Sequence, residues 1–139
     1  MIQSGSIMAQ QIAQAALVFE ERRTGHAPKS VTVVMSDNTL MITLHGALSP
    51  AEIALAKSPA GAARVQEFHR QLFNSAADSL RQEIKRITGV EVREAVAEVE
   101  PIASTVVQAF TNGTVVQVFL LADDVPSETW SGSATPYIS

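Results

Sequence analysis

Apolar residues recur every three or four positions near the start of the chain and predict a helix over residues 6 to 23. The stripe consists of Met8, Ile12, Ala15, Ala16 and Phe19, and it is widened by Leu17 and Val18. Gly25 then stands where a left-handed residue commonly ends a helix, and Pro28 prevents the helix from resuming. We therefore expect a first helix that ends in a glycine cap.

Two short runs with the two-residue period of a β-strand follow, over residues 31 to 36 and 39 to 46. In the second run, Leu40, Ile42 and Leu44 alternate with less apolar residues. The intervening Asp37-Asn38 pair tolerates left-handed backbone and suits a tight turn. The pattern predicts an antiparallel hairpin with one face on a core.

The next segment predicts a short helix followed by the longest helix of the chain. Ser49 can cap the short helix, a proline follows at its first position, and Glu52 completes a capping box. Ser58 starts the long helix in the same way, and Gly89 ends it. Its apolar positions are spaced by three or four throughout: Val65, Phe68, Leu72, Ala76, Leu80, Ile84 and Ile87.

The remainder of the chain is rich in β-forming residues up to residue 121. Strands are predicted over residues 90 to 99 and 114 to 121, and Asn112-Gly113 is a strong hairpin signal before the second. Apolar residues on both faces of the first strand indicate a bulge or a shift of pattern. Residues 105 to 110 form either a further strand or part of a loop. Residues 123 to 139 have no periodicity and are expected to be a flexible tail.

Both long helices end in a basic last turn followed by a glycine, which indicates a helix–hairpin unit used twice. The expected fold class is α+β, with residues 1 to 122 forming a single domain. Its architecture is a two-layer sandwich, in which a mostly antiparallel sheet of four or five strands has both long helices on one face. The other sheet face is then open. Because Met41 and His45 and several Val and Phe residues lie on these strands, we expect a second copy to cover it in a homodimer.

Composition and charge narrow the classes of function. The chain has 139 residues, enough for one core, and it has no cysteine, which excludes disulfides and thiolate chemistry. A formal net charge of −4 argues against nucleic acid, because binding phosphates needs a dense positive face. We see no signal peptide and no apolar run of about 20 residues that would cross a bilayer. The expectation is a cytoplasmic protein, without membrane insertion and at most peripheral to a membrane.

No catalytic, metal or cofactor motif is present. His26, His45 and His69 lack the spacing of zinc ligands, and the chain has no nucleophile elbow, P-loop or dinucleotide fingerprint. We therefore expect no catalytic residue, no metal and no cofactor. Three alternatives stay open: a zinc site assembled in three dimensions, an anion at the helix start after Ser58, and chemistry among the glutamates of residues 91 to 100.

One small polar cluster stands out as a site for a ligand or partner. It gathers basic residues around the first helix end, with a carboxylate from the short helix nearby. The candidate contact residues are Arg22, Arg23, His26, Pro28, Lys29 and Glu52, and the structural caps are Gly25, Ser49, Ser58 and Gly89.

The order of several short motifs resembles the MpsC-type family. These motifs are Gly25-His26-Ala27-Pro28, Leu48-Ser49-Pro50-Ala51-Glu52 with Leu55 and Gly61, and Ile87-Thr88-Gly89-Val90. The resemblance spans about residues 7 to 121. Ala27 replaces the usual glycine, Ser49 replaces threonine, and the stretch around residues 101 to 110 is longer than usual.

The resemblance implies an accessory or regulatory role in ion or bicarbonate transport, beside membrane transporter subunits. It supplies no catalytic residues. The first hypothesis is thus a non-enzymatic accessory binding module. The alternative is a domain that binds a small molecule or anion, or a minor enzyme, with a pocket between residues 25 to 29 and 49 to 52.

Overall fold

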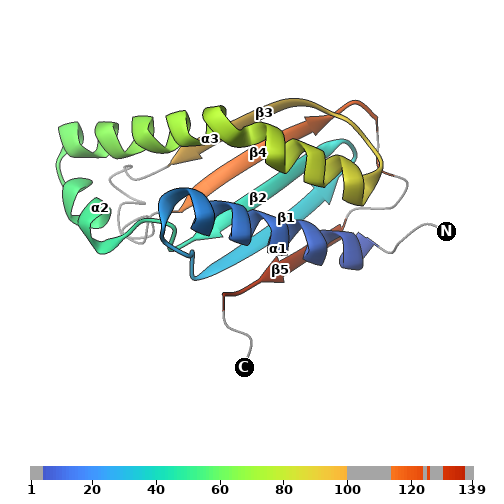
Figure 1. Cartoon of the computed structure of the whole chain (residues 1–139), viewed down its shortest axis with the longest axis horizontal. Helices are drawn as coiled ribbons and strands as arrows, with labels where there is room; N and C mark the ends of the chain where they lie inside the picture. The colour runs from blue at the N-terminus through green and yellow to red at the C-terminus, as the bar shows by residue number, and fades with distance from the viewer. Residues whose placement is uncertain (1–4, 100–113, 124, 126–129, 137–139) are drawn as a thin grey trace.

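The computed structural model describes residues 5–99, 114–123, 125 and 130–136 (Figure 1). Within these ranges the helices are α1 (Gly5–Thr24), α2 (Pro50–Leu55) and α3 (Pro59–Thr88). The strands are β1 (Ser30–Ser36), β2 (Thr39–His45), β3 (Val92–Val99), β4 (Val115–Leu121) and β5 (Trp130–Ala134). The possible strand over residues 105 to 110 lies outside the described residues.

The strands form one five-stranded sheet in the order β3-β4-β2-β1-β5, and every neighbouring pair is antiparallel. The β1–β2 hairpin follows α1 and the β3–β4 pair follows α3, and the two units meet through β2 and β4. Figure 1 shows α1 and α3 side by side on one face of the sheet. The predicted two-layer α+β architecture and the repeated helix–hairpin unit are therefore confirmed.

The four predicted caps are present. Ser49 Oγ accepts from the Glu52 amide at 3.3 Å, and the Ser49 amide donates to Glu52 Oε1 at 3.0 Å, which completes the capping box. The Ser58 hydroxyl accepts a hydrogen bond from the Gly61 amide, in the first turn of α3, at 3.0 Å. Ser58 therefore caps this helix. Gly25 and Gly89 end the long helices with φ of 77° and 79°, a conformation that glycine adopts without strain.

The core lies between the sheet and the two long helices. β1 and β2 alternate strictly, so one face of each strand is buried under the helices. The predicted apolar stripe of α3 is partly wrong, because Phe68 is 50% exposed whereas His69 and Phe73 are buried. Because the polar residue His69 occupies a core position, the buried face of α3 is not fully apolar in sequence. The apolar spacing therefore indicates the neighbouring face, which includes Phe68.

The predicted irregularity in β3 is confirmed. Its pairing with β4 shifts register between Val92 and Glu94, which accommodates the change of pattern along this strand. The strand begins at Val92, two residues later than expected.

The C-terminal region differs from the expected flexible tail, because residues 130 to 134 form the edge strand β5 beside β1. The helix α1 lies close over this strand. A Cβ atom on Gly132 would come within 2.7 Å of the Ala9 Cβ, so a residue without a side chain is required there. Serine and glycine give no strand signal in the sequence, and the strand is specified instead by this contact with the helix.

The sheet face opposite the helices carries partly exposed apolar side chains. Val34 is 44% exposed and Met41 is 43% exposed, and the two lie opposite each other on β1 and β2. Val118 of β4 lies opposite Met41 on the other side. An apolar row therefore crosses three adjacent strands on the face that α1 and α3 leave uncovered.

Candidate functional site

The structure separates the residues predicted to contact a ligand or partner. Arg22 and Arg23, in the last turn of α1, line a groove between the long helices. Glu52 lies in α2 and hydrogen-bonds His69 of α3. The remaining three residues belong to the loop that follows α1, so the six do not form a single pocket.

The loop residues make contacts that hold the chain between α1 and β1. His26 Nε2 donates to the carbonyl of Gly46 at 3.2 Å, and the Lys29 amide donates to the His45 carbonyl at 2.7 Å. Pro28 is buried. These contacts join the end of α1 to the end of the first hairpin, which is a structural use of the residues.

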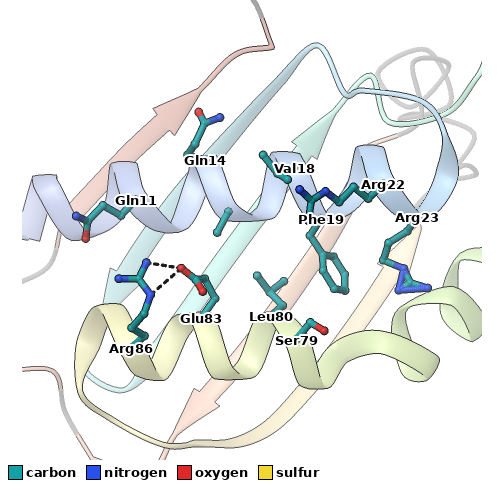
Figure 2. A pocket seen from close by; sticks show the side chains of 11 residues that line it. Gln11, Gln14, Val18, Phe19, Arg22, Arg23, Ser79, Leu80, Glu83 and Arg86 are labelled. Carbon is teal, nitrogen blue, oxygen red and sulfur yellow. Dashed lines mark hydrogen bonds and ion pairs between the residues drawn. The ribbon is translucent and has the colours of Figure 1, made fainter.

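The groove between α1 and α3 has a volume of about 860 Å³. In Figure 2, Phe19 of α1 points toward α3, and Leu80 and Glu83 of α3 point toward α1. From α1 it is lined by Gln11, Gln14, Ala15, Val18, Phe19, Arg22 and Arg23, and from α3 by Ser79, Leu80, Glu83 and Arg86. Gln11 and Arg22 are eleven residues apart, so the α1 wall is about 16 Å long at 1.5 Å per helical residue. The groove is therefore elongated along the helices.

The middle of the groove is apolar. Ala15, Val18 and Phe19 come from α1 and Leu80 comes from α3. The first three are only half-buried although the rest of their helix faces the core. They are the part of the wide apolar band of α1 that the rest of the protein covers only in part.

The ends of the groove are polar and carry more positive than negative charge. The guanidinium carbon of Arg23 lies 5.0 Å from the centre of the Phe19 ring, and Arg23 Nη2 donates to Ser75 Oγ at 3.3 Å. Its Nε and Nη1 are buried and have no hydrogen-bond partner among the residues that the structure describes. At the other end, Arg86 Nε donates to Glu83 Oε1 at 2.9 Å. With the exposed Arg22, three arginines stand against one glutamate, although the whole chain has a net charge of −4.

A buried polar cluster lies behind the Arg23 end of the groove and joins the three helices. His69 Nε2 is 2.7 Å from Glu52 Oε2, and His69 Nδ1 is 3.8 Å from Glu20 Oε2. His69 and Glu20 are each only 5% exposed. The cluster links α1, α2 and α3 through one imidazole ring.

The two carboxylates of this cluster have opposite pKa shifts. Burial raises the pKa of Glu20 above its ordinary value, and the charges of His69 and Arg23 offset this only in part. Burial also acts to raise the pKa of Glu52, but hydrogen bonds from His69 and from the Ser49 amide outweigh it and lower the pKa to about 2. Glu52 is thus ionised at neutral pH, and His69 Nε2 is the donor in their hydrogen bond.

The interior of this cluster is too small for a substrate. A cavity of about 10 Å³ is bounded by Glu20, Arg23, His69 and Gln117, among others. That volume suits at most a single water molecule. The cluster therefore has the character of a structural link between helices.

Two findings concern metal binding and membrane-spanning helices. Among the described residues, no group of three or more histidine or acidic side chains is arranged to hold a metal ion. Within the same ranges, no helix has both the length and the apolar character needed to span a membrane.

Sequence reasoning found Arg22 and Arg23 but missed the groove and the His69 link. The signal for the groove was present, because Val18 and its neighbours make the apolar band of α1 wider than one packing face needs. The His69–Glu52 contact joins residues 17 positions apart on two helices, and neither side chain is unusual in its local pattern.

Comparison with known proteins shows the family of the chain. The family model described as Na+-translocating membrane potential-generating system (MpsC) matches residues 5–119. No protein with a curated description and no solved structure matches the chain. The matched range includes every groove residue and ends within β4, whereas β5 lies beyond it.

Proposed function

The chain belongs to the MpsC family, as its short motifs indicated, and on that premise we propose that it is a non-enzymatic accessory module that binds another component of a Na+-translocating membrane potential-generating system. Such a module regulates the transport of ions or bicarbonate, or helps to assemble the transporter. It does not carry the ions itself. It works from the cytoplasmic side and is held at the membrane by its partner.

The observation that carries this proposal is the groove between α1 and α3. It combines a partly exposed apolar centre with charged ends, which is the usual character of a surface that binds another molecule. It also lies wholly within the residues that match the family. The alternative pocket between residues 25 to 29 and 49 to 52 has less support, because His26 and Glu52 already bond to other parts of the chain.

The proposal includes a homodimer formed through the open sheet face. The row of Val34, Met41 and Val118 is apolar and lies on three adjacent strands. Two sheets that pack through such faces bury these side chains against one another. This surface and the groove lie on opposite sides of the sheet, so a dimer leaves the groove free for the partner.

Co-purification with the membrane subunits tests the accessory role. The chain is co-expressed with the membrane subunits of the system, and a tag on one of them is used to recover the complex in detergent. We expect the wild-type chain to co-elute and Ala15→Arg, which fills the groove, to reduce the recovered amount at least tenfold. Ala63→Arg is the matched control, because Ala63 is exposed on α3 outside the groove.

Absence of the wild-type chain from the purified complex would overturn the accessory role. Equal recovery of both arginine variants would show that the partner binds elsewhere. Circular dichroism of each variant confirms that the fold is kept.

A further inference from the structure

We propose that the groove between α1 and α3 receives an amphipathic α-helix of a partner subunit, with acidic residues at the end that meets Arg22 and Arg23. This inference rests on the proposed function and names the chemistry of the partner. It follows from the shape of the groove, the small residues on its walls and the charge at its ends.

The shape of the groove suits a helix. On α1 its wall includes Gln11, Ala15, Val18 and Arg22, which are spaced by four, three and four residues and so form one continuous stripe. On α3, Ser79, Glu83 and Arg86 form a second stripe in the same way. Two such stripes on neighbouring helices make an elongated channel, and a third helix can pack into it as helices pack into grooves elsewhere.

Small residues on both walls allow close approach. Ala15 of α1 and Ser79 of α3 are the short side chains of the groove. A helix that lies over them can bring its own apolar side chains against the half-buried Val18 and Phe19. Burial of this apolar centre supplies the attraction, in proportion to the area removed from water.

The charges determine which helix fits. Arg86 is already paired with Glu83, so that end of the groove has no surplus charge. The other end holds the exposed Arg22 beside the half-buried Arg23, and the lining of the groove has no carboxylate at this end. A carboxylate of a partner pairs well with such guanidinium groups, and covering Arg22 without one would be costly. The incoming helix is therefore acidic at this end and uncharged or mixed at the other.

The same charges disfavour two other occupants. A second copy that packed groove to groove would bring two surfaces with surplus positive charge together. An anionic membrane would repel a chain whose net charge is −4, and this repulsion would oppose the attraction of Arg22 and Arg23 for the membrane. A partner helix with local negative charge avoids both problems.

Photo-crosslinking inside the intact system identifies the occupant. A photoreactive phenylalanine analogue replaces Val18 in the groove or, as a control, the exposed Ala63 of α3. We expect the Val18 derivative to label a helical segment of a subunit of the system that carries Asp or Glu within one turn of the labelled residue. The Ala63 derivative should give no such product.

A charge swap then tests the pairing. Arg22→Glu should weaken the complex about tenfold, while Arg64→Glu, which changes an exposed arginine outside the groove, should alter the affinity less than twofold. Replacing the partner's crosslinked acidic residue by arginine should restore most of the affinity lost in Arg22→Glu.

The outcomes separate this inference from the proposed function. If the wild-type chain binds the subunits but Val18 labels lipid, a second copy or a segment without acidic residues, the inference is wrong and the accessory role stands. The same holds if the charge swap restores nothing. If the wild-type chain does not bind the subunits at all, both are wrong.

Discussion

His69 Nε2 lies 2.7 Å from Glu52 Oε2, and this hydrogen bond fixes the short helix α2 to the long helix α3. The other carboxylate oxygen of Glu52 accepts from the Ser49 amide at 3.0 Å. None of the six residues of α2 is buried, and a helix of that length is not stable alone. The polar contacts of Glu52 therefore help to hold α2 in place, together with the half-buried Ile53 that packs against the core.

Glu52→Gln should make the stability of the protein less sensitive to acid. The pKa of Glu52 is lowered to about 2 in the folded protein, whereas the pKa of a glutamate in an unfolded chain is about 4.3. Its contribution to stability is thus complete above the unfolded pKa and is lost as the pH falls toward the folded one. Urea denaturation at several pH values between about 5 and 3 should show a shallower decline for Glu52→Gln than for the wild-type chain.

The matched control for this change is Glu67→Gln. Glu67 is an exposed carboxylate on α3 that pairs with Arg70, and it has no contact with His69 in the described structure. Its variant should lose stability with falling pH in parallel with the wild-type chain. A parallel decline in Glu52→Gln as well would contradict the assignment.

Glu20→Gln should act in the opposite pH direction. Burial raises the pKa of Glu20, so the folded state holds a proton at pH values where the unfolded state has released it. Its contribution is complete below the unfolded pKa and is lost as the pH rises through the folded one. Glutamine keeps the neutral form at every pH, so the stability of Glu20→Gln relative to wild type should increase from pH about 5 to about 8.

The same urea titrations check this prediction, with Glu21→Gln as the control, since Glu21 is exposed on the same helix. A variant that becomes less stable than wild type as the pH rises would mean that Glu20 is ionised and held by Arg23 and His69. That result would reverse the sign of its role in the cluster.

Gly132→Ala should lower the free energy of unfolding by about 1–3 kcal/mol, because overpacking a close contact forces the backbone to move. The added Cβ would lie 2.7 Å from the Ala9 Cβ and 2.9 Å from backbone atoms of α1. Urea denaturation measures the loss, and Ser133→Ala on the exposed side of β5 should change little. The double variant with Ala9→Gly should recover only part of the loss, because the backbone atoms stay in place. A full recovery would show that only the two side chains collide.

The sequence predicted most of the architecture because its signals are local. The caps at Ser49, Ser58 and Gly89 and the alternation along β2 each depend on residues within a few positions of one another. Where the arrangement depends on contacts between distant segments, the sequence fell short. β5 is such a case, since its place follows from the approach of α1 to Gly132.

The site was harder to predict for the same reason. Arg22 and Arg23 were visible as a basic helix end, but their neighbours in the groove come from α3, some sixty positions later in the chain. His69 lacks the spacing of a zinc ligand, and nothing in its local sequence marks it as a buried residue. Its burial depends on Glu52 and Glu20, which lie on two other helices.

Met41→Glu should convert the proposed homodimer into a monomer. Met41 lies at the centre of the apolar row on the open sheet face, with Val34 opposite on one side and Val118 on the other. Its side chain is 43% exposed in the single chain, so a charge there leaves the core intact but cannot be buried unpaired between two sheets.

Sedimentation velocity over a wide range of concentrations should give a dimer for the wild-type chain and a monomer for the variant. Gln82→Glu, exposed on α3 across the sheet, should remain dimeric. A wild-type monomer at every concentration, or a dimer that persists in Met41→Glu, would exclude this face as the interface.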